Sequence, residues 1–240
     1  MTEVRHIDDA SFTAWAALVL DAFGGDGQDP ESLRQARDVV DQERSLGAFD
    51  GPLLVGTATS FIDRIRLPFG AEAPLAAVSG VAVAPTHRRR GILTRLMRQQ
   101  LTELHEQGEP LAGLWASEAA IYPRFGYGLG TYVSHLRVRR EQSAFRRPYP
   151  VEHVVQIDEE AARRIFPGLQ ARAANGHPGF ILRSATHWED AFYDPPARRH
   201  GAGRHRFVVH QDGTEPDGYA WYRTRRQRGA SGENESVLQV

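Results

Sequence analysis

The chain has 240 residues, which is more than one average domain and fewer than two. Its formal net charge of -1 leaves no global field that would favour nucleic acid or a membrane surface as a partner. Cysteine is absent and all 29 basic residues are arginine, which excludes disulfides, thiolate catalysis, Cys-ligated zinc and a Schiff-base lysine.

The N-terminal residues, MTEVRHIDD, are charged and do not form the apolar segment of a secretion signal. No apolar run elsewhere approaches the length of a membrane-spanning helix. We therefore expect a cytoplasmic protein with no membrane partner.

The first part of the chain alternates short strand patterns with two amphipathic helices. Asp9 or Ser11 is expected to cap the first helix, and Pro30 suits the first turn of the second. Gly51 and Pro52 separate two apolar runs, which predicts a hairpin. The strands expected here are 4–8, 46–50 and 53–62.

The central stretch joins an apolar strand at 78–83 to a basic turn and then to a helix. The turn contains three consecutive arginines and a glycine at 88–91. Apolar residues then recur at helical spacing: Ile92, Leu93, Leu96, Met97, Leu101 and Leu104. Because the first-turn amides and the positive end of the helix dipole point toward the turn, this stretch predicts an anion site.

The segment after this helix is expected to return to the sheet. A short buried strand is predicted at 111–116, Ser117 is expected to cap a brief helical turn, and 126–140 supplies the last strands. The first half lacks βαβ crossovers, so the pattern predicts an α+β fold with a mixed, mostly antiparallel central sheet flanked by helices. This domain is expected to occupy residues 1–140.

The polar stretch 141–150 is predicted to be a domain junction. Beyond it we expect a helix at 157–170 broken at Pro167, a short amphipathic piece at 188–193, and a hairpin of 206–210 with 218–224. A new apolar alternation starts at 236. Residues 141–240 are thus predicted to be part of a second domain, incomplete at its C-terminal end.

A strand, an arginine turn and a helix N-terminus together suit a ligand with a diphosphate and an extended amide chain. Coenzyme A has both features. Its acyl thioester would lie alongside Val81, Ala82 and Val83, where a backbone N–H can polarise the thioester carbonyl.

The blocks VAVAPTHRRRGILTRLM and ASEAAIYPRFGYG resemble the GNAT acetyltransferase superfamily, and within it the Eis (enhanced intracellular survival) branch. Leu93 stands where the general cofactor motif has Gly or Ala. The resemblance implies two tandem GNAT-like folds, acetylation of amines including those of aminoglycosides, and assembly as a homo-oligomer, a hexamer. Residues 141–240 would then be part of the second GNAT-like domain.

The resemblance also implies roles for individual residues. Val81, Ala82 and Val83 would be the backbone rail for the pantetheine, and Ser117 and Glu118 would contact the cofactor. The pyrophosphate would be held by Arg89, Arg90, Gly91, Ile92, Leu93 and Thr94.

Tyr122 would be the general acid that returns a proton to the leaving thiolate. A phenol in a dry site can donate such a proton. Tyr127 is the competing residue for this role, and a packed ring with a hydrogen-bonded hydroxyl is the alternative for either tyrosine.

The sequence thus predicts an acetyl-CoA-dependent N-acetyltransferase that transfers an acetyl group directly to a primary amine. The amine belongs to a small molecule such as an aminoglycoside-like polyamine, or to a lysine. The alternative is a CoA-binding GNAT-fold module without catalysis. No metal is expected, because His200, His205 and His210 are spaced by five and share no helical or strand face.

Overall fold

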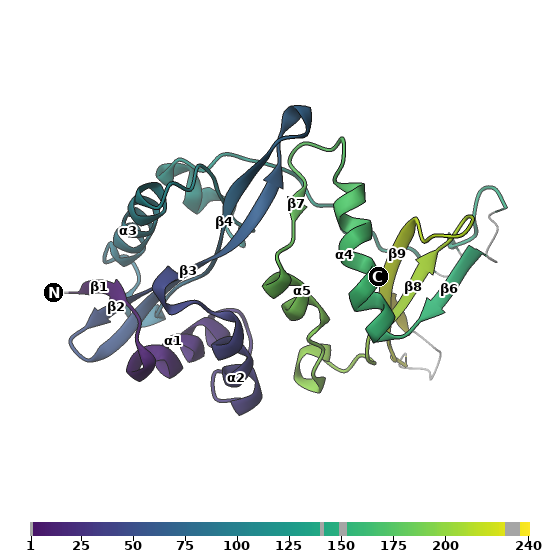
Figure 1. Ribbon diagram of the computed structural model, residues 1–240. Helices are drawn as coiled ribbons and strands as arrows, with labels where there is room; N and C mark the ends of the chain where they lie inside the picture. Colours follow the sequence, from purple (N-terminus) through teal and green to yellow (C-terminus); the bar gives the residue numbers. More distant parts are fainter. Residues whose placement is uncertain (1, 140–141, 149–152, 229–235) are drawn as a thin grey trace. The chain divides into compact units, whose positions relative to one another are not determined.

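The computed structural model describes residues 2–139, 142–148, 153–228 and 236–240 (Figure 1). These residues form two compact units. Unit 1 comprises Met1–Gly130 and Pro178–Ser184, and unit 2 comprises Thr131–His177 and Ala185–Val240. Each unit has its own sheet and its own hydrophobic core.

Unit 1 is built on one sheet with the strand order β1-β2-β3-β4-β5, and β7 pairs with β3 in addition. All of these pairs are antiparallel except β4 with β5. The elements of unit 1 are β1 (Glu3–His6), α1 (Asp9–Ala22), α2 (Pro30–Val39), η1 (Gln42–Arg44), β2 (Ser45–Asp50), β3 (Leu53–Arg66), η2 (Pro68–Gly70), β4 (Glu72–Val83), η3 (Pro85–His87), α3 (Ile92–Glu106), β5 (Ala112–Gly113), η4 (Ala119–Phe125) and β7 (Ile181–Leu182). The predicted mixed, mostly antiparallel α+β sheet is confirmed.

Helices α1 and α3 cover opposite faces of this sheet (Figure 1). On the α3 face, Ile92 and Leu96 pack with Leu46 and Val55 of the sheet in one buried cluster. On the other face, Trp15 of α1 is buried and its indole N–H donates to the carbonyl of Leu46 at 3.0 Å. The helix that follows the arginine turn is therefore anchored against the strands that precede it.

Asp8 caps α1, so the prediction that Asp9 or Ser11 is the cap is wrong. The Asp8 carboxylate accepts from the Ser11 backbone N–H at 2.9 Å, and the Ser11 hydroxyl accepts from the Asp8 N–H at 2.9 Å. This reciprocal pair is a capping box, and it starts the helix earlier than either predicted cap would. Pro30 does open α2, as predicted.

Unit 2 contains an antiparallel sheet of order β10-β9-β8-β6 packed against helices. Its elements are β6 (Val154–Ile157), α4 (Glu159–Ala173), α5 (Ala185–Phe192), η7 (Pro196–Arg199), β8 (Arg206–His210), β9 (Gly218–Arg225) and β10 (Val237–Gln239). The predicted hairpin and the predicted strand near the C-terminal residue are confirmed. Phe166 is the centre of the core, with its ring 4.2 Å from that of Tyr219.

Helix α4 runs through Pro167 without interruption, so the predicted break there is wrong. A proline inside a helix costs about 3 kcal/mol. Ala162, Phe166 and Leu169 are buried along one face of the helix. Burying one large apolar side chain contributes roughly 1.5–3 kcal/mol, so this packing outweighs the loss of one helical hydrogen bond.

The strands predicted at 126–140 are absent from the described part of that segment, residues 126–139. A strand needs a neighbour for its backbone groups, and no described strand pairs with these residues. Tyr132, Leu136 and Val138 are accordingly exposed. In the predicted junction 141–150, Glu141, Tyr149 and Pro150 lie outside the described residues, and 142–148 contain no strand.

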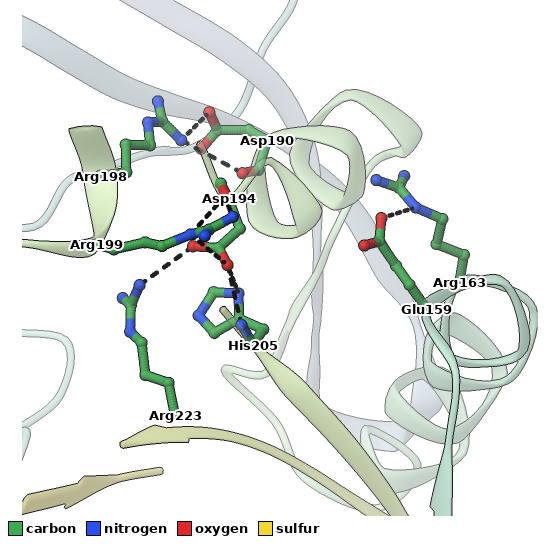
Figure 2. Close-up of polar contacts among 8 residues, drawn as sticks. All are labelled: Glu159, Arg163, Asp190, Asp194, Arg198, Arg199, His205 and Arg223. Carbon is green, nitrogen blue, oxygen red and sulfur yellow. Dashed lines mark hydrogen bonds and ion pairs between the residues drawn. The ribbon is translucent and has the colours of Figure 1, made fainter. Parts of the chain in front are cut away.

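Figure 2 shows a polar cluster in unit 2 that forms around Asp194, just after α5. The Asp194 carboxylate accepts from the backbone N–H of His205 at 2.9 Å and pairs with Arg199 at 3.2 Å and Arg223 at 3.3 Å. The His205 ring stacks on Trp221 at 5.8 Å, and burial lowers the pKa of this imidazole. The cluster ties the segment between α5 and β8 to β9.

Candidate active site

Strand β4 changes its register against β3 at a bulge centred on Gly80. Ser79 pairs with Thr59, whereas Ala82 pairs with Thr57. Gly80 has φ 58, a left-handed conformation that glycine adopts without a steric penalty. The hydroxyl of the buried Thr57 donates to the Gly80 carbonyl at 2.7 Å and holds the bulge in place.

Beyond the bulge, one edge of β4 has no strand partner among the described residues. The parallel pairing with β5 covers only Ala76 with Ala112 and Ala77 with Gly113. The following part of β4, which includes Val81 to Val83, pairs with β3 alone. This edge can therefore take up an extended ligand by hydrogen bonds to its backbone.

The chain then turns into α3 through two residues with left-handed backbone geometry. Arg89 has φ 62, and Gly91, the N-cap of α3, has φ 76. Because the N-cap residue is glycine, it has no side chain that could accept a hydrogen bond from the first-turn N–H groups of the helix. The side chains of Arg89 and Arg90 are exposed beside this helix start. An anion would meet both the amides and the guanidinium groups there.

The residues predicted to hold a pyrophosphate lie together in this turn and helix start. The side chain of Ile92 is buried in the core, so only its backbone N–H is available to a ligand. Leu93 and Thr94 are half-buried on the first turn of α3. Their contact with a ligand stays a prediction.

Tyr122 lies on η4 and packs into the cluster formed between β4 and α3. The same cluster contains Val81 of the open strand and Leu93 of the helix start. Burial raises the pKa of the Tyr122 phenol, and the Glu118 carboxylate raises it further. At neutral pH the hydroxyl therefore carries its proton, as a general acid requires.

Tyr127 lies next to Tyr122, just after the turn at Gly126. The two rings meet edge to face, with centroids 5.8 Å apart and an interplanar angle of 71°. Burial raises the pKa of Tyr127 to about 12, with a further contribution from Tyr122. The Tyr127 hydroxyl is buried and has no hydrogen-bond partner among the described residues.

Ser117 and Glu118 are exposed residues at the start of η4. The N-cap position of η4 is Glu118, with no side-chain hydrogen bond, so the prediction that Ser117 caps this turn is wrong. The helical turn starts one residue later than expected. The Glu118 carboxylate acts on Tyr122 electrostatically and raises the pKa of its phenol.

Sequence reasoning missed Thr57, which sets the bulge. A threonine in an apolar strand is unremarkable in sequence, because β-branched residues are common in strands. Its role depends on the register of β3 against β4, which pairs Thr57 with Ala82 and brings its hydroxyl within 2.7 Å of the Gly80 carbonyl.

Within the described ranges, no group of three or more His, Asp or Glu side chains has an arrangement suited to a metal ion. Two of the three histidines considered above have acidic neighbours: His205 lies near Asp194, and His210 pairs with Asp217. None of the described helices has the length and apolar character needed to cross a bilayer.

Comparison with known proteins identifies the family. Residues 3–130 match a family model described as an acetyltransferase (GNAT) domain. The chain belongs to the GNAT acetyltransferase family. Residues 179–240 match a second family model with the same description.

The relatives of this GNAT chain include Eis proteins. An uncharacterized N-acetyltransferase of Streptomyces avermitilis is 36% identical over 242 residues, which cover 99% of this chain and 58% of the relative. The N-acetyltransferase Eis of Mycobacterium tuberculosis is 34% identical over 206 residues, 82% of this chain and 50% of that protein. The predicted resemblance to the Eis-like branch is thereby confirmed.

Solved structures show the same relationship. Eis1 from Mycobacterium abscessus has a TM-score of 0.72 at 32% identity, covering 99% of this chain and 57% of that one. A GCN5-related N-acetyltransferase from Anabaena variabilis has a TM-score of 0.72 at 15% identity, which shows the shared fold; 99% of this chain and 57% of that one are covered. The chain thus spans a little over half the length of these proteins.

Proposed function

We propose that this chain is an acetyl-CoA-dependent N-acetyltransferase that transfers an acetyl group directly to a primary amine. One observation carries the proposal: Val81 of the open edge of β4, Leu93 at the start of α3 and Tyr122 all pack against the same buried cluster. Strand β4 supplies a backbone edge for an amide chain, the start of α3 supplies a site for phosphate, and Tyr122 supplies a protonated phenol.

The residues present fit acetyl-CoA. The unpaired edge at Val81, Ala82 and Val83 suits the two amides of the pantetheine arm. Exposed Arg89 and Arg90 beside the uncapped first turn of α3 suit the pyrophosphate. Ser117 and Glu118 are proposed to contact the cosubstrate near the start of η4.

The acyl donor supplies an activated carbonyl and a thiolate leaving group. A backbone N–H on the open edge of β4 stabilises the carbonyl oxygen as it gains charge during attack by the amine nitrogen. As the carbon–sulfur bond breaks, Tyr122 donates its phenolic proton to the sulfur. The amine loses its proton to water, so the products are an acetamide and a free thiol.

Residues 1–140 are the catalytic GNAT domain and 141–240 belong to a second GNAT-like domain, a division supported by the two family matches at 3–130 and 179–240. The amine is carried by an aminoglycoside-like polyamine or by a lysine, and the protein works in the cytoplasm as a homo-oligomer.

The test of this function is turnover of acetyl-CoA with a panel of polyamines and aminoglycosides. Release of free thiol can be followed without interference from protein thiols, because the protein has no cysteine. We expect Tyr122→Phe to lower kcat by about 100-fold, the lower end of the usual contribution of a general acid. Tyr132→Phe is the matched control, since Tyr132 is 84% exposed. Wild-type rates in Tyr122→Phe would remove its assigned role.

The alternative, a CoA-binding module without catalysis, predicts a different pair of results. Calorimetry would then show CoA binding, while no amine in the panel would increase thiol release. Lysine-bearing peptides added to the same panel separate acetylation of protein lysines from acetylation of small amines.

A further inference from the structure

The Tyr127 hydroxyl is a buried polar group that the proposed reaction does not yet use. It has no hydrogen-bond partner among the described residues, although its oxygen is shielded from solvent. Buried hydroxyls nearly always have a partner, and leaving one unpaired is destabilising. Because an unpaired buried hydroxyl destabilises the folded protein, the Tyr127 hydroxyl is a candidate for a role during the reaction.

Tyr127 lies directly beside Tyr122, the proposed general acid. Gly126, with φ 92, ends η4 and turns the chain so that the Tyr127 ring meets the Tyr122 ring edge on. Both rings belong to the cluster that contains Val81 and Leu93. The ring centroids are 5.8 Å apart, so the two tyrosine side chains lie side by side.

Proton donation by Tyr122 leaves a negative phenolate in a partly buried site. The Glu118 carboxylate nearby disfavours this charge. A hydroxyl donor to the phenolate oxygen would offset that penalty, because hydrogen bonds to charged oxygens are the strong ones. Among the described residues, the Tyr127 hydroxyl is a donor beside Tyr122 with no competing acceptor.

We propose that Tyr127 is a positioning residue whose hydroxyl donates a hydrogen bond to the Tyr122 oxygen as that oxygen gives up its proton. This inference rests on the proposed function. Tyr127 itself keeps its proton throughout, so the transferred proton comes from Tyr122 alone and is later replaced from water.

Tyr127→Phe removes the hydroxyl and keeps the ring contact. We expect kcat to fall about tenfold, in line with the loss of one hydrogen bond to a charged group. The KM for acetyl-CoA should stay within about twofold, because Tyr127 is not assigned to bind it. The alkaline limb of the pH–rate profile should move to higher pH, since the Tyr122 phenolate loses a stabilising donor.

A double-mutant cycle provides the decisive comparison. Tyr122→Phe/Tyr127→Phe should be no slower than Tyr122→Phe alone, because Tyr127 acts only through Tyr122. Fully additive losses, or a Tyr127→Phe enzyme with the wild-type rate and pH profile, would overturn the inference. Tyr132→Phe again serves as the control.

A titration separates this inference from the proposed function. The ultraviolet absorbance of tyrosinate is measured for the wild type, both single variants and the double variant. The difference between Tyr127→Phe and the double variant isolates the titration of Tyr122, and it should lie at higher pH than in the wild-type background. This readout needs no turnover, so an inactive protein would refute the proposed function while the titration still decides on Tyr127.

Discussion

The buried Tyr127 phenol should make the folded protein less stable at alkaline pH. Its pKa is raised by burial to about 12, above that of a phenol in the unfolded chain. A raised pKa contributes stability that is fully present below the unfolded value and is lost as pH rises through the folded value. The free energy of unfolding should therefore decline between about pH 10 and 12, and Tyr127→Phe should flatten the decline. Urea unfolding at a series of pH values measures both curves, and parallel curves would contradict the assignment.

At the residue scale, the sequence was informative where a side chain acts near its own motif. Tyr122 lies within the block ASEAAIYPRFGYG that carries the family resemblance, and the same block contains its neighbours Glu118 and Tyr127. Thr57 acts on Gly80 across a strand pair, 23 positions away. A contact of that kind depends on strand register, which residue types alone do not specify.

At the element scale, the bulge of β4 can be tested through Thr57. Thr57→Val keeps the volume and removes the donor to the Gly80 carbonyl, so it should lower the free energy of unfolding by about 1–3 kcal/mol. It should also weaken acetyl-CoA binding, because the bulge precedes the open edge of β4. Chemical denaturation and calorimetry measure the two effects. Thr57→Ser, which keeps the hydroxyl, is the matched control. Equal stability and equal acetyl-CoA affinity of the two variants would show that the Thr57 hydroxyl does not hold the bulge in place.

Elements that satisfy their own backbone groups or pair with a sequence neighbour were predicted well. The helix starting at Ile92 and the hairpin of β2 with β3 are examples. The strands expected at 126–140 do not form in the described residues 126–139, because apolar alternation is not sufficient without a partner strand. The break expected at Pro167 failed because the burial of Phe166 and its neighbours overrides local propensity.

At the scale of the whole molecule, the two units should respond separately to changes in their cores. Asp194 is 11% exposed, and Asp194→Asn leaves Arg199 and Arg223 without their carboxylate. Breaking such a pair should cost about 3 kcal/mol of stability in unit 2. Binding of acetyl-CoA, assigned to unit 1, should be unchanged in calorimetry at a temperature where both units are folded.

Asp190→Asn is the matched control for this change. The carboxylate of Asp190 pairs with Arg198 at 3.0 Å but is 42% exposed, and such pairs contribute about 1 kcal/mol or less. Equal losses of stability in the two variants, seen in thermal unfolding, would show that burial does not make the ion pairs of Asp194 more stabilising than the exposed pair of Asp190.

Strand β7 comes from later in the chain and joins the sheet of unit 1, which limits where the chain can be truncated. Ile181 and Leu182 pair with Ile65 and Arg64, and the Ser184 N–H donates to the buried carboxylate of Asp63 at 3.2 Å. A shortened chain that ends at residue 140 keeps every residue assigned to the cosubstrate but strips this edge of β3. A bare strand edge invites pairing with another molecule. A shortened chain made to test cosubstrate binding should therefore carry residues 178–184 grafted through a linker, so that the edge of β3 stays covered.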